Sequence, residues 1–476
     1  METTGLGYIT LDRLTRTLSG GEAQRVQLSN QLGSALSGVL YILDEPSIGL
    51  HPRDTATLIA QIKKLTARKN TVCVVEHDAS VIKASDYIVE LGPGSGEMGG
   101  RVVHAGNTEE FLSSANTLTA QYLRGIKKIN VPTWRRKGSG KHIVVKGARG
   151  NNLKNIDVSI PLHAFTCVTG VSGSGKSTLI TDTLYAALAL RFEPSASGGA
   201  RPLSYASLEG ANHITGVRLI NQEPIGKTPR SNPVTYIGVF DEIRHIFATR
   251  SSAKKEGLSP GNFSFNVPGG RCEACKGEGV MKLEMYFMPD MYITCASCNG
   301  KRYSQAVLDV KHGGKNIFDA LNMTFDEAYV FFSGNREITK KVSVLKDVGL
   351  GYLRLGQSAL TLSGGEAQRL KIARELSASG KDQDFLYILD EPTTGLHTED
   401  IKKLLYVLGR LVDSGNTVIV VEHNLDCVKT ADYVIDLGPE GGEGGGMVIT
   451  EGPPEKIARC KESHTGRYLK EALKEG

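Results

Sequence analysis

Short apolar runs alternate with stretches of helical spacing in the second half of the chain. Residues 164–169 form an apolar, β-branched run, and residues 178–190 then carry apolar side chains at the spacing of a helix. Two further apolar runs, residues 385–389 and 418–421, are typical of buried strands. Together these patterns predict an α/β fold.

Other segments extend this prediction. Residues 142–161 alternate apolar and polar side chains around an Asn-Asn pair, which predicts strands that lead into the run at 164–169. Helical spacing returns at residues 240–249 and 317–332, and both segments are predicted helices.

A long internal repeat covers both ends of the chain. GLGYITLDRLTRTLSGG at residues 5–21 matches GLGYLRLGQSALTLSGG at residues 349–365. The match continues in order through LSGGEAQR at 18–25 and 362–369, YILDEP at 41–46 and 387–392, Gly-Leu-His at 49–51 and 395–397, and Val-Val-Glu-His ending at His77 and His423. A repeat of this length predicts two homologous domains rather than an array of short units.

Composition narrows the class of protein. The 476 residues suffice for two to four domains, and 40% hydrophobic with 22% charged residues is ordinary for a globular protein. A net charge of +5 neither requires nor excludes nucleic acid, and 6% aromatic residues argue against broad base-stacking surfaces. The sequence has no apolar run long enough to span a bilayer and no signal-peptide pattern at its start. Four of the eight cysteines form two C-x-x-C pairs, which favours a metal site and a reducing cytoplasm over a disulfide framework.

The stretch GVSGSGKST at residues 170–178 fits the phosphate-binding P-loop, G-x-x-x-x-G-K-[ST]. A predicted strand precedes it and a predicted helix follows, as the motif requires. Its glycines allow backbone N–H groups to surround a polyphosphate, Lys176 would reach the β- and γ-phosphates, and Ser177 would hold Mg²⁺. The alternative is a glycine-rich turn without a ligand. The predicted nucleotide-binding residues of the loop are Gly170, Gly173, Gly175, Lys176, Ser177 and Thr178.

LSGGEAQR is the signature motif of ABC-type ATPases, and each copy precedes an apolar strand that ends in Asp-Glu, the Walker B motif. In the second copy Asp390 would bind Mg²⁺ through water and Glu391 would orient or deprotonate the attacking water. His423 would sense the γ-phosphate, and Gln222, which follows the apolar residues 217–220, is a candidate Q-loop residue. The alternatives are an acidic helix cap, a core histidine and a surface glutamine.

Two cysteine pairs, Cys272 with Cys275 and Cys295 with Cys298, are separated by nineteen residues. This spacing is within the range of structural zinc sites with four thiolate ligands. Between the pairs, residues 281–287 alternate apolar and polar side chains and residues 291–294 follow a Pro-Asp turn. We expect a β-hairpin held at its base by zinc; free or disulfide-bonded cysteines are the alternative.

These motifs predict a domain order. Residues 1–123 form the later part of a first cassette, 124–142 a basic linker, 143–191 the P-loop part of a second cassette, 192–345 an inserted domain with the zinc module at about 268–303, and 346–476 the signature and Walker B part. A basic run with Pro and Gly in the linker is more typical of a solvated connection than of a DNA contact. Because the repeat begins close to Met1, we expect the first cassette to lack its phosphate-binding half.

With a zinc module placed inside the cassette, the chain resembles the UvrA family, the damage-sensing excinuclease component of bacterial nucleotide excision repair. The resemblance covers essentially the whole chain and rests on GARGNNLKNI at 147–156, TGVSGSGKSTLI at 169–180, IGKTPRSNP at 225–233, FSFNVPGGRCEACKGEG at 263–279, GQSALTLSGGEAQR at 356–369, ILDEPTTGLH at 388–397 and DLGPEGGEGGG at 436–446. It implies ABC-type ATPase cores with an inserted helical signature domain and a zinc-bound hairpin, and it implies ATP, Mg²⁺ and Zn²⁺ as cofactors.

The family pairs its two cassettes head to tail. The resemblance therefore implies that the P-loop at Gly170 meets Ser19, Gly20 and Gly21 of the first signature, so that one ATP site forms within the chain. The second signature would face a missing P-loop, and Asp44, Glu45 and His77 would lack a phosphate.

The resemblance also implies partners: double-stranded DNA, preferentially damaged, and a second copy of the chain. DNA contacts would fall on the basic turn and on the hairpin at 287–291. The turn residues are Lys227, Arg230, Ser231 and Asn232. Because the family's first-cassette insertion is expected to be absent, binding of the partner UvrB is in doubt, and a separate N-terminal half is an alternative partner.

Two other interpretations stay open. An ABC ATPase of a transporter or a ribosome-associated factor would share the P-loop and the signature, but its cassettes normally lack the four-cysteine module. The chain could instead be a half that binds DNA or a partner with weak ATPase or none.

Overall fold

The computed structural model describes residues 6–9, 11–12, 14–15, 20–33, 36–94, 96, 99–193, 201–226, 228–285, 291–378 and 384–475. Contacts divide the chain into two compact units, Met1–Asn221 with Gly380–Gly476 and Gln222–Ser379. The first unit holds the first repeat together with the P-loop and the Walker B part of the second repeat, and the second unit holds the insertion and the second signature. The predicted domain boundaries stay a proposal.

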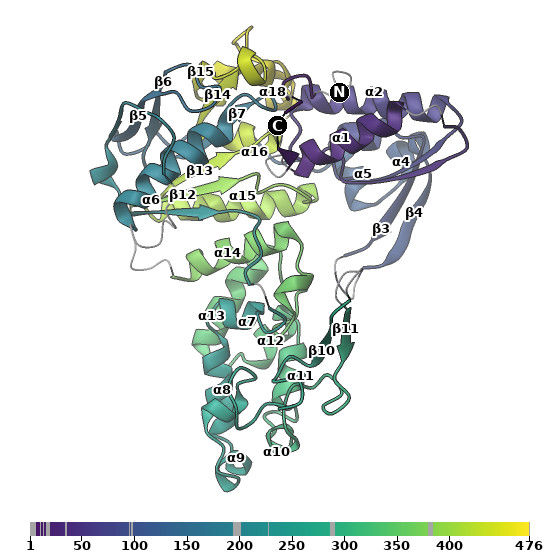
Figure 1. Ribbon diagram of the computed structural model, residues 1–476, viewed down its shortest axis with the longest axis vertical. Helices are drawn as coiled ribbons and strands as arrows, with labels where there is room; N and C mark the ends of the chain where they lie inside the picture. The colour runs from purple at the N-terminus through teal and green to yellow at the C-terminus, as the bar shows by residue number, and fades with distance from the viewer. Residues whose placement is uncertain are drawn as a thin grey trace. The chain divides into compact units, whose positions relative to one another are not determined.

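The second repeat builds a six-stranded sheet in the order β15-β14-β7-β13-β12-β9 (Figure 1). Its strands are β7 (Phe165–Gly170), β9 (Gly216–Ile220), β12 (Phe385–Asp390), β13 (Thr417–Val421), β14 (Tyr433–Gly438) and β15 (Met447–Gly452). All neighbours pair in parallel except β14 and β15. Every residue of β7 and β13 is buried, which explains why these strands are continuous apolar runs in the sequence. The predicted α/β class is confirmed.

The remaining elements of the second repeat surround this sheet. They are β5 (His142–Ala148), β6 (Ile156–Pro161), η4 (Thr178–Tyr185), α6 (Ala186–Phe192), β8 (Ser207–Glu209), η5 (Ala211–His213), α15 (Thr398–Asp413), α16 (Leu425–Thr430), η8 (Gly442–Gly444), α17 (Pro454–Ile457) and α18 (His464–Glu475). The predicted helix at 178–190 forms as η4 followed by α6, and the predicted strands within 142–161 form as β5 and β6, which pair antiparallel.

The first repeat contains α1 (Gly20–Gly33), β1 (Leu40–Asp44), α2 (Pro52–Ala67), β2 (Thr71–Val75), α3 (Ala79–Ala84), β3 (Tyr87–Gly92), β4 (Arg101–Asn107), α4 (Thr108–Ser114) and α5 (Leu118–Leu123). Among the described residues its strands form two separate pairs, β1 with β2 and β3 with β4. Apolar side chains are consequently open to solvent: Ile42 and Val89 are 70% and 58% exposed, whereas their counterparts Ile388 and Ile435 are fully buried.

Two arginines of the segment between α5 and β5 are held against the second repeat, whereas most of its other residues are exposed. Arg135 pairs with Glu455 at 2.6 Å and donates to the Lys429 carbonyl at 3.0 Å. Arg136 pairs with Asp413 at 2.7 Å and with the buried Asp432 at 3.3 Å. The basic run is therefore mostly exposed to solvent and is anchored to the second repeat through these two arginines.

The second unit is mostly helical. It contains α7 (Pro233–Tyr236), α8 (Phe240–Ala248), α9 (Ser251–Lys255), η6 (Pro260–Phe263), β10 (Val280–Leu283), β11 (Met291–Thr294), α10 (Gln305–Leu308), α11 (Ile317–Asn322), α12 (Phe325–Phe331), α13 (Arg336–Asp347), η7 (Ala359–Thr361) and α14 (Gly364–Ala378). The predicted hairpin is confirmed, because β10 and β11 pair antiparallel with Leu283 opposite Met291.

The helix predicted over residues 317–332 is not continuous in the structure. Residues 317–332 form two helices, α11 and α12, because Thr324 starts a new helix with a capping box: its hydroxyl accepts from the Glu327 N–H, and the Glu327 carboxylate accepts from the Thr324 N–H.

Candidate ATP site and metal site

The P-loop follows β7, the central strand of the sheet, and leads into η4. Gly170, Gly173 and Gly175 have φ angles of 135°, 74° and 104°, which L side chains rarely adopt. A Cβ at Gly170 would also lie 2.1 Å from the Leu437 carbonyl oxygen. The backbone conformation of the loop therefore requires glycine at these positions.

Several polar groups of the loop are buried. The Lys176 side chain is buried, and its Nζ donates to the carbonyl oxygens of Gly170 and Val171, both at 3.0 Å. Burial lowers the pKa of Lys176, and the charges of Glu391, Asp54, Asp390 and Asp436 oppose that shift. Within the described residues, the hydroxyls of Ser172 and Ser174 are buried without a hydrogen-bond partner. These unpaired donors fit an anion.

The Walker B acids stand at the end of β12. Glu391 has a φ of 44°, an unusual conformation for a glutamate that is typical of strained functional positions. Its Oε1 lies 3.8 Å from Nε2 of His423. Burial, reinforced by the charges of Asp390 and Glu422, raises the pKa of Glu391 to about 7, whereas burial holds the pKa of His423 well below its usual value. The pair thus combines a carboxylate of near-neutral pKa with a neutral imidazole.

The first repeat lies directly on the P-loop of the second. A Cβ added at Gly173 would meet the Tyr8 ring at 2.8 Å, and one at Gly442 would meet the Tyr8 Cβ at 3.0 Å. The Tyr8 hydroxyl donates to Glu22 Oε1 at 2.7 Å and accepts from Arg25 at 3.5 Å. Glu22 and Arg25 belong to the first signature, so Tyr8 links that signature to the phosphate loop.

Gly20 and Gly21 of this signature begin α1, and Ser19 lies outside the described residues.

The segment after each Walker B strand reaches the acid of the other repeat. A Cβ at Gly49 would lie 3.0 Å from Glu391 Oε2, and a Cβ at the equivalent Gly395 would lie 3.2 Å from Glu45 Oε1. Both glycines also have a φ of 65°, a conformation that L side chains rarely adopt. The two repeats therefore meet in a reciprocal way.

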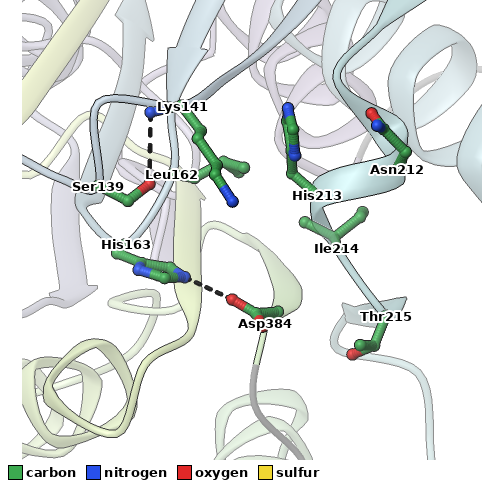
Figure 2. A pocket seen from close by; sticks show the side chains of 9 residues that line it. All are labelled: Ser139, Lys141, Leu162, His163, Asn212, His213, Ile214, Thr215 and Asp384. Carbon is green, nitrogen blue, oxygen red and sulfur yellow. Dashed lines mark hydrogen bonds and ion pairs between the residues drawn. The ribbon is translucent and has the colours of Figure 1, made fainter.

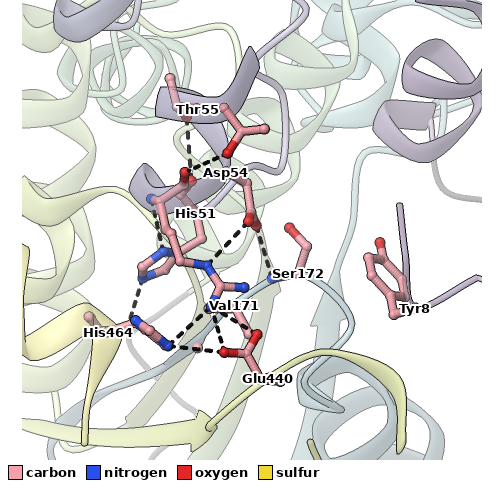
Figure 3. A network of polar contacts seen from close by, with 12 residues as sticks. Tyr8, His51, Asp54, Thr55, Val171, Ser172, Glu440 and His464 are labelled. Carbon is pink, nitrogen blue, oxygen red and sulfur yellow. Dashed lines mark hydrogen bonds and ion pairs between the residues drawn. The ribbon is translucent and has the colours of Figure 1, made fainter. Parts of the chain in front are cut away.

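The histidines that follow these glycines also contact the other repeat. His51 Nε2 lies 3.2 Å from the Thr465 hydroxyl, and His397 Nε2 lies 3.1 Å from the Thr119 hydroxyl. Figure 3 shows His51 beside Asp54, His464 and Glu440, in a network that connects α2 of the first repeat to the P-loop of the second.

The first repeat has its own Walker B geometry. Glu45 has the same φ of 44° as Glu391, and His77 Nε2 lies 3.7 Å from Glu45 Oε1. Asp44, which ends β1, is exposed. Burial raises the pKa of Glu45, although the nearby His77 opposes the shift.

The predicted Q-loop and DNA residues fall in the second unit. Gln222 lies against the second signature, since a Cβ at Gly364 would be 3.3 Å from its Oε1. Arg230 pairs with Glu278 at 3.4 Å. Lys227 lies outside the described residues, as do residues 287–290 of the hairpin.

The two other residues of the basic turn make local contacts. Ser231 donates its N–H to the Thr228 carbonyl at 3.0 Å. Asn232 is buried and caps α7 by accepting from the Thr235 N–H at 3.0 Å. The Asn232 side chain thus serves the structure of the turn, which argues against a phosphate contact by this residue.

The four cysteines converge on one point. The Sγ atoms of Cys272, Cys275, Cys295 and Cys298 all lie within 4.8 Å of one another. Left-handed residues follow each pair, Lys276 and Gly277 after the first and Asn299 and Gly300 after the second, and the Gly279 N–H donates to Cys275 Sγ at 3.2 Å. Four thiols in this arrangement fit a tetrahedral zinc ion without an open position.

A separate polar pocket of about 200 Å³ lies in the first unit (Figure 2). His163 Nε2 pairs with Asp384 Oδ1 at 2.7 Å on its wall, beside Lys141 and His213. None of the predicted site residues lines this pocket.

Several residues that contact the P-loop were not predicted from the sequence. Tyr8 and Asp54 reach it from the first repeat, and Asn152 Nδ2 donates to the Gly173 carbonyl at 2.9 Å. A signal existed for Tyr8, because it recurs as Tyr352, whose hydroxyl donates to Glu366 over the same fourteen-residue spacing.

Comparison with known proteins gives one consistent result. The chain is 57% identical over 465 residues to UvrABC system protein A of Thermus thermophilus, and 55% identical over 471 residues to that of Staphylococcus aureus (strain COL). Both matches cover 98% of this chain. The chain belongs to the UvrA family.

A solved structure, UvrA2 from Deinococcus radiodurans, agrees with this assignment to the UvrA family. It superposes with a TM-score of 0.92 at 46% identity over 99% of this chain and 57% of its own. The chain spans about half the length of the curated UvrA relatives it matches, 48% and 49%. No protein-family model matches the chain. In the described part, no helix is long and apolar enough to cross a membrane.

Proposed function

We propose that the chain binds and hydrolyses ATP at a composite site that uses the P-loop of its second repeat and the signature of its first. One observation carries the proposal: Tyr8, which is hydrogen-bonded to Glu22 of the first signature, lies against Gly173 in the P-loop of the second repeat. Membership of the UvrA family supports an ATPase of the ABC type.

In this proposal the phosphate chain of ATP lies on the P-loop, with Lys176 and the hydroxyls of Ser172 and Ser174 as its donors. Ser177 and Asp390 would hold Mg²⁺, which neutralises phosphate charge when bound. Glu391 takes the proton of the attacking water, and His423 senses the γ-phosphate. Gln222 stays the candidate Q-loop residue. The first signature, Ser19, Gly20 and Gly21, closes the site.

The test is steady-state hydrolysis of MgATP by the purified chain. Lys176→Ala removes the buried charge that the phosphates need, and we expect hydrolysis to fall by about 10²-fold or more. Ser19→Arg, a change in the other repeat, should reduce it as strongly. Parent-like hydrolysis by Ser19→Arg would exclude the first signature from the site.

We further propose that the chain binds duplex DNA through backbone phosphates, as expected for a repair protein of this family that reads damage as altered shape. The basic turn supports a phosphate contact, because Arg230 keeps about a third of its side chain exposed beside Glu278. Partnership with UvrB, and dimerisation, are proposals that rest on the family alone.

A salt titration of DNA affinity on unrelated duplexes tests this second proposal. Lys227→Ala with Arg230→Ala should weaken binding to all sequences alike and reduce the slope of log K against log salt by about two. Lys63→Ala with Lys64→Ala, an equal loss of charge on the exposed face of α2, is the control. A parent-like slope in the first double variant would remove the turn from the DNA path.

A further inference from the structure

Asp54 of the first repeat reaches the P-loop of the second. It lies in the first turn of α2, and its Oδ2 accepts from the Ser172 N–H at 3.4 Å (Figure 3). Only 10% of the Asp54 side chain is exposed, and Arg53 Nε lies 3.6 Å from its other oxygen. A carboxylate is thus held, nearly dry, against a backbone N–H of the phosphate loop.

The surroundings of this carboxylate are those of an anion site. Ser172 is the third residue of the P-loop, its own hydroxyl is buried without a described partner, and the Lys176 ammonium is buried in the same loop. Backbone N–H groups of a P-loop bind the oxygens of a polyphosphate. A negative side chain on one of them takes a position that a phosphate oxygen would otherwise fill.

We propose that Asp54 determines nucleotide specificity at the composite site: its carboxylate occupies an anion position of the P-loop and disfavours the additional terminal phosphate of a nucleoside triphosphate. This inference rests on the proposed ATPase function. Repulsion between like charges in a poorly hydrated site is strong and acts on the nearest phosphate first. The binding of ATP is therefore disfavoured more than the binding of ADP.

The chain supplies a matched comparison. Asp400 is the residue that the repeat places at the position of Asp54, in the first turn of α15. Its Oδ1 pairs with Lys403 Nζ at 3.0 Å, on its own helix. Asp54 and Asp400 thus carry the same charge at equivalent positions, and each has a cation of its own helix as a neighbour, Arg53 and Lys403. What distinguishes Asp54 is its hydrogen bond with the Ser172 N–H of the P-loop.

The experiment measures the affinities of ADP and of the non-hydrolysable ATP analogue AMP-PNP, with Mg²⁺, by calorimetric titration of the full chain. Asp54→Asn keeps the size of the side chain and removes its charge, and we expect about tenfold tighter AMP-PNP binding with less than about threefold change for ADP. Asp54→Glu, which restores the charge, should return the affinity ratio toward that of the parent. Asp400→Asn should leave both affinities within about twofold.

The outcomes are distinct. An unchanged ratio of the two affinities in Asp54→Asn, or an equal change of that ratio in Asp400→Asn, would overturn the role of Asp54 and leave the proposed ATPase intact. Failure of the parent and of Asp54→Asn to bind either nucleotide would remove the proposed function, and this inference with it. Parent-like ADP binding by Asp54→Asn shows that its site is folded.

Discussion

Glu391 joins three features at one residue: a left-handed backbone, a neighbouring histidine and a raised pKa. Its φ of 44° aims the carboxylate out of the end of β12, where Gly49 of the other repeat leaves room for it. Because burial raises the pKa of Glu391 to about 7, its carboxylate can accept a proton at a pH that matches its own pKa, near neutral. His423 stays neutral, so its charge does not change over the same range.

This pKa predicts how hydrolysis depends on pH. The ionised Glu391 is the active base, so the rate should rise about tenfold between pH 6 and pH 8. Glu391→Gln should retain ATP binding and stall turnover. Measuring the pH profile of the parent and nucleotide binding by the variant checks both; a flat profile, or parent-like turnover in the variant, would contradict the role.

Stability gives a readout of the same carboxylate that is independent of turnover. The pKa of Glu391 is about 7 in the folded chain, above its ordinary value of 4.5, so the folded chain keeps this proton at pH values where the unfolded chain has lost it. The contribution of Glu391 to the free energy of unfolding therefore falls as the pH rises from about 4.5 to about 7. Replacing Glu391 by Gln should therefore raise the melting temperature more at pH 8 than at pH 5.5.

At the scale of elements, the hairpin of β10 and β11 shows why a small module would need a metal ion. Strands β10 and β11 have four residues each, and Met281, Leu283, Met291 and Ile293 are 42% to 52% exposed, so the hairpin has little core of its own. Four thiolates at its base can supply roughly 10–16 kcal/mol on binding zinc. A zinc ion bound there would thus replace the missing packing.

Elemental analysis tests the zinc assignment. We expect one zinc per chain, lost in Cys272→Ser with Cys295→Ser, together with loss of hydrogen-exchange protection in β10 and β11. Cys460→Ser, a cysteine outside the cluster, is the control and should keep the metal. Purified parent without zinc, or a double variant with an unchanged content, would count against the site.

Short sequence motifs predicted several elements well, because each motif spans only a few residues. The P-loop, the strands β7, β12 and β13 and the hairpin each follow from short-range pattern and spacing. The break between α11 and α12 was not predicted because the apolar spacing continues across Thr324, where a capping box starts a new helix. Helical periodicity does not register such a cap.

Contacts between the repeats were much harder to predict. Tyr8 and Asp54 lie more than a hundred residues from the P-loop that they touch, and their own surroundings in the sequence are ordinary. Only the fold brings them there. The resemblance implied a composite site, but it did not indicate which side chains would join its halves.

At the scale of the whole molecule, we propose that one chain supplies both halves of the ATP site. The reciprocal contacts Gly49–Glu391 and Gly395–Glu45, together with His51–Thr465 and His397–Thr119, support a pairing of the two repeats within the first unit. Each repeat brings a Walker B acid to the other, and one of the two acids, Glu391, lies beside the P-loop Lys176.

Mixing two inactive variants tests this claim most directly. Lys176→Ala damages the P-loop half and Ser19→Arg the signature half of the same site. If both halves come from one chain, an equimolar mixture should hydrolyse ATP no faster than either variant alone. Recovery of a substantial fraction of parent activity in the mixture would show that the halves come from different chains and would contradict the account.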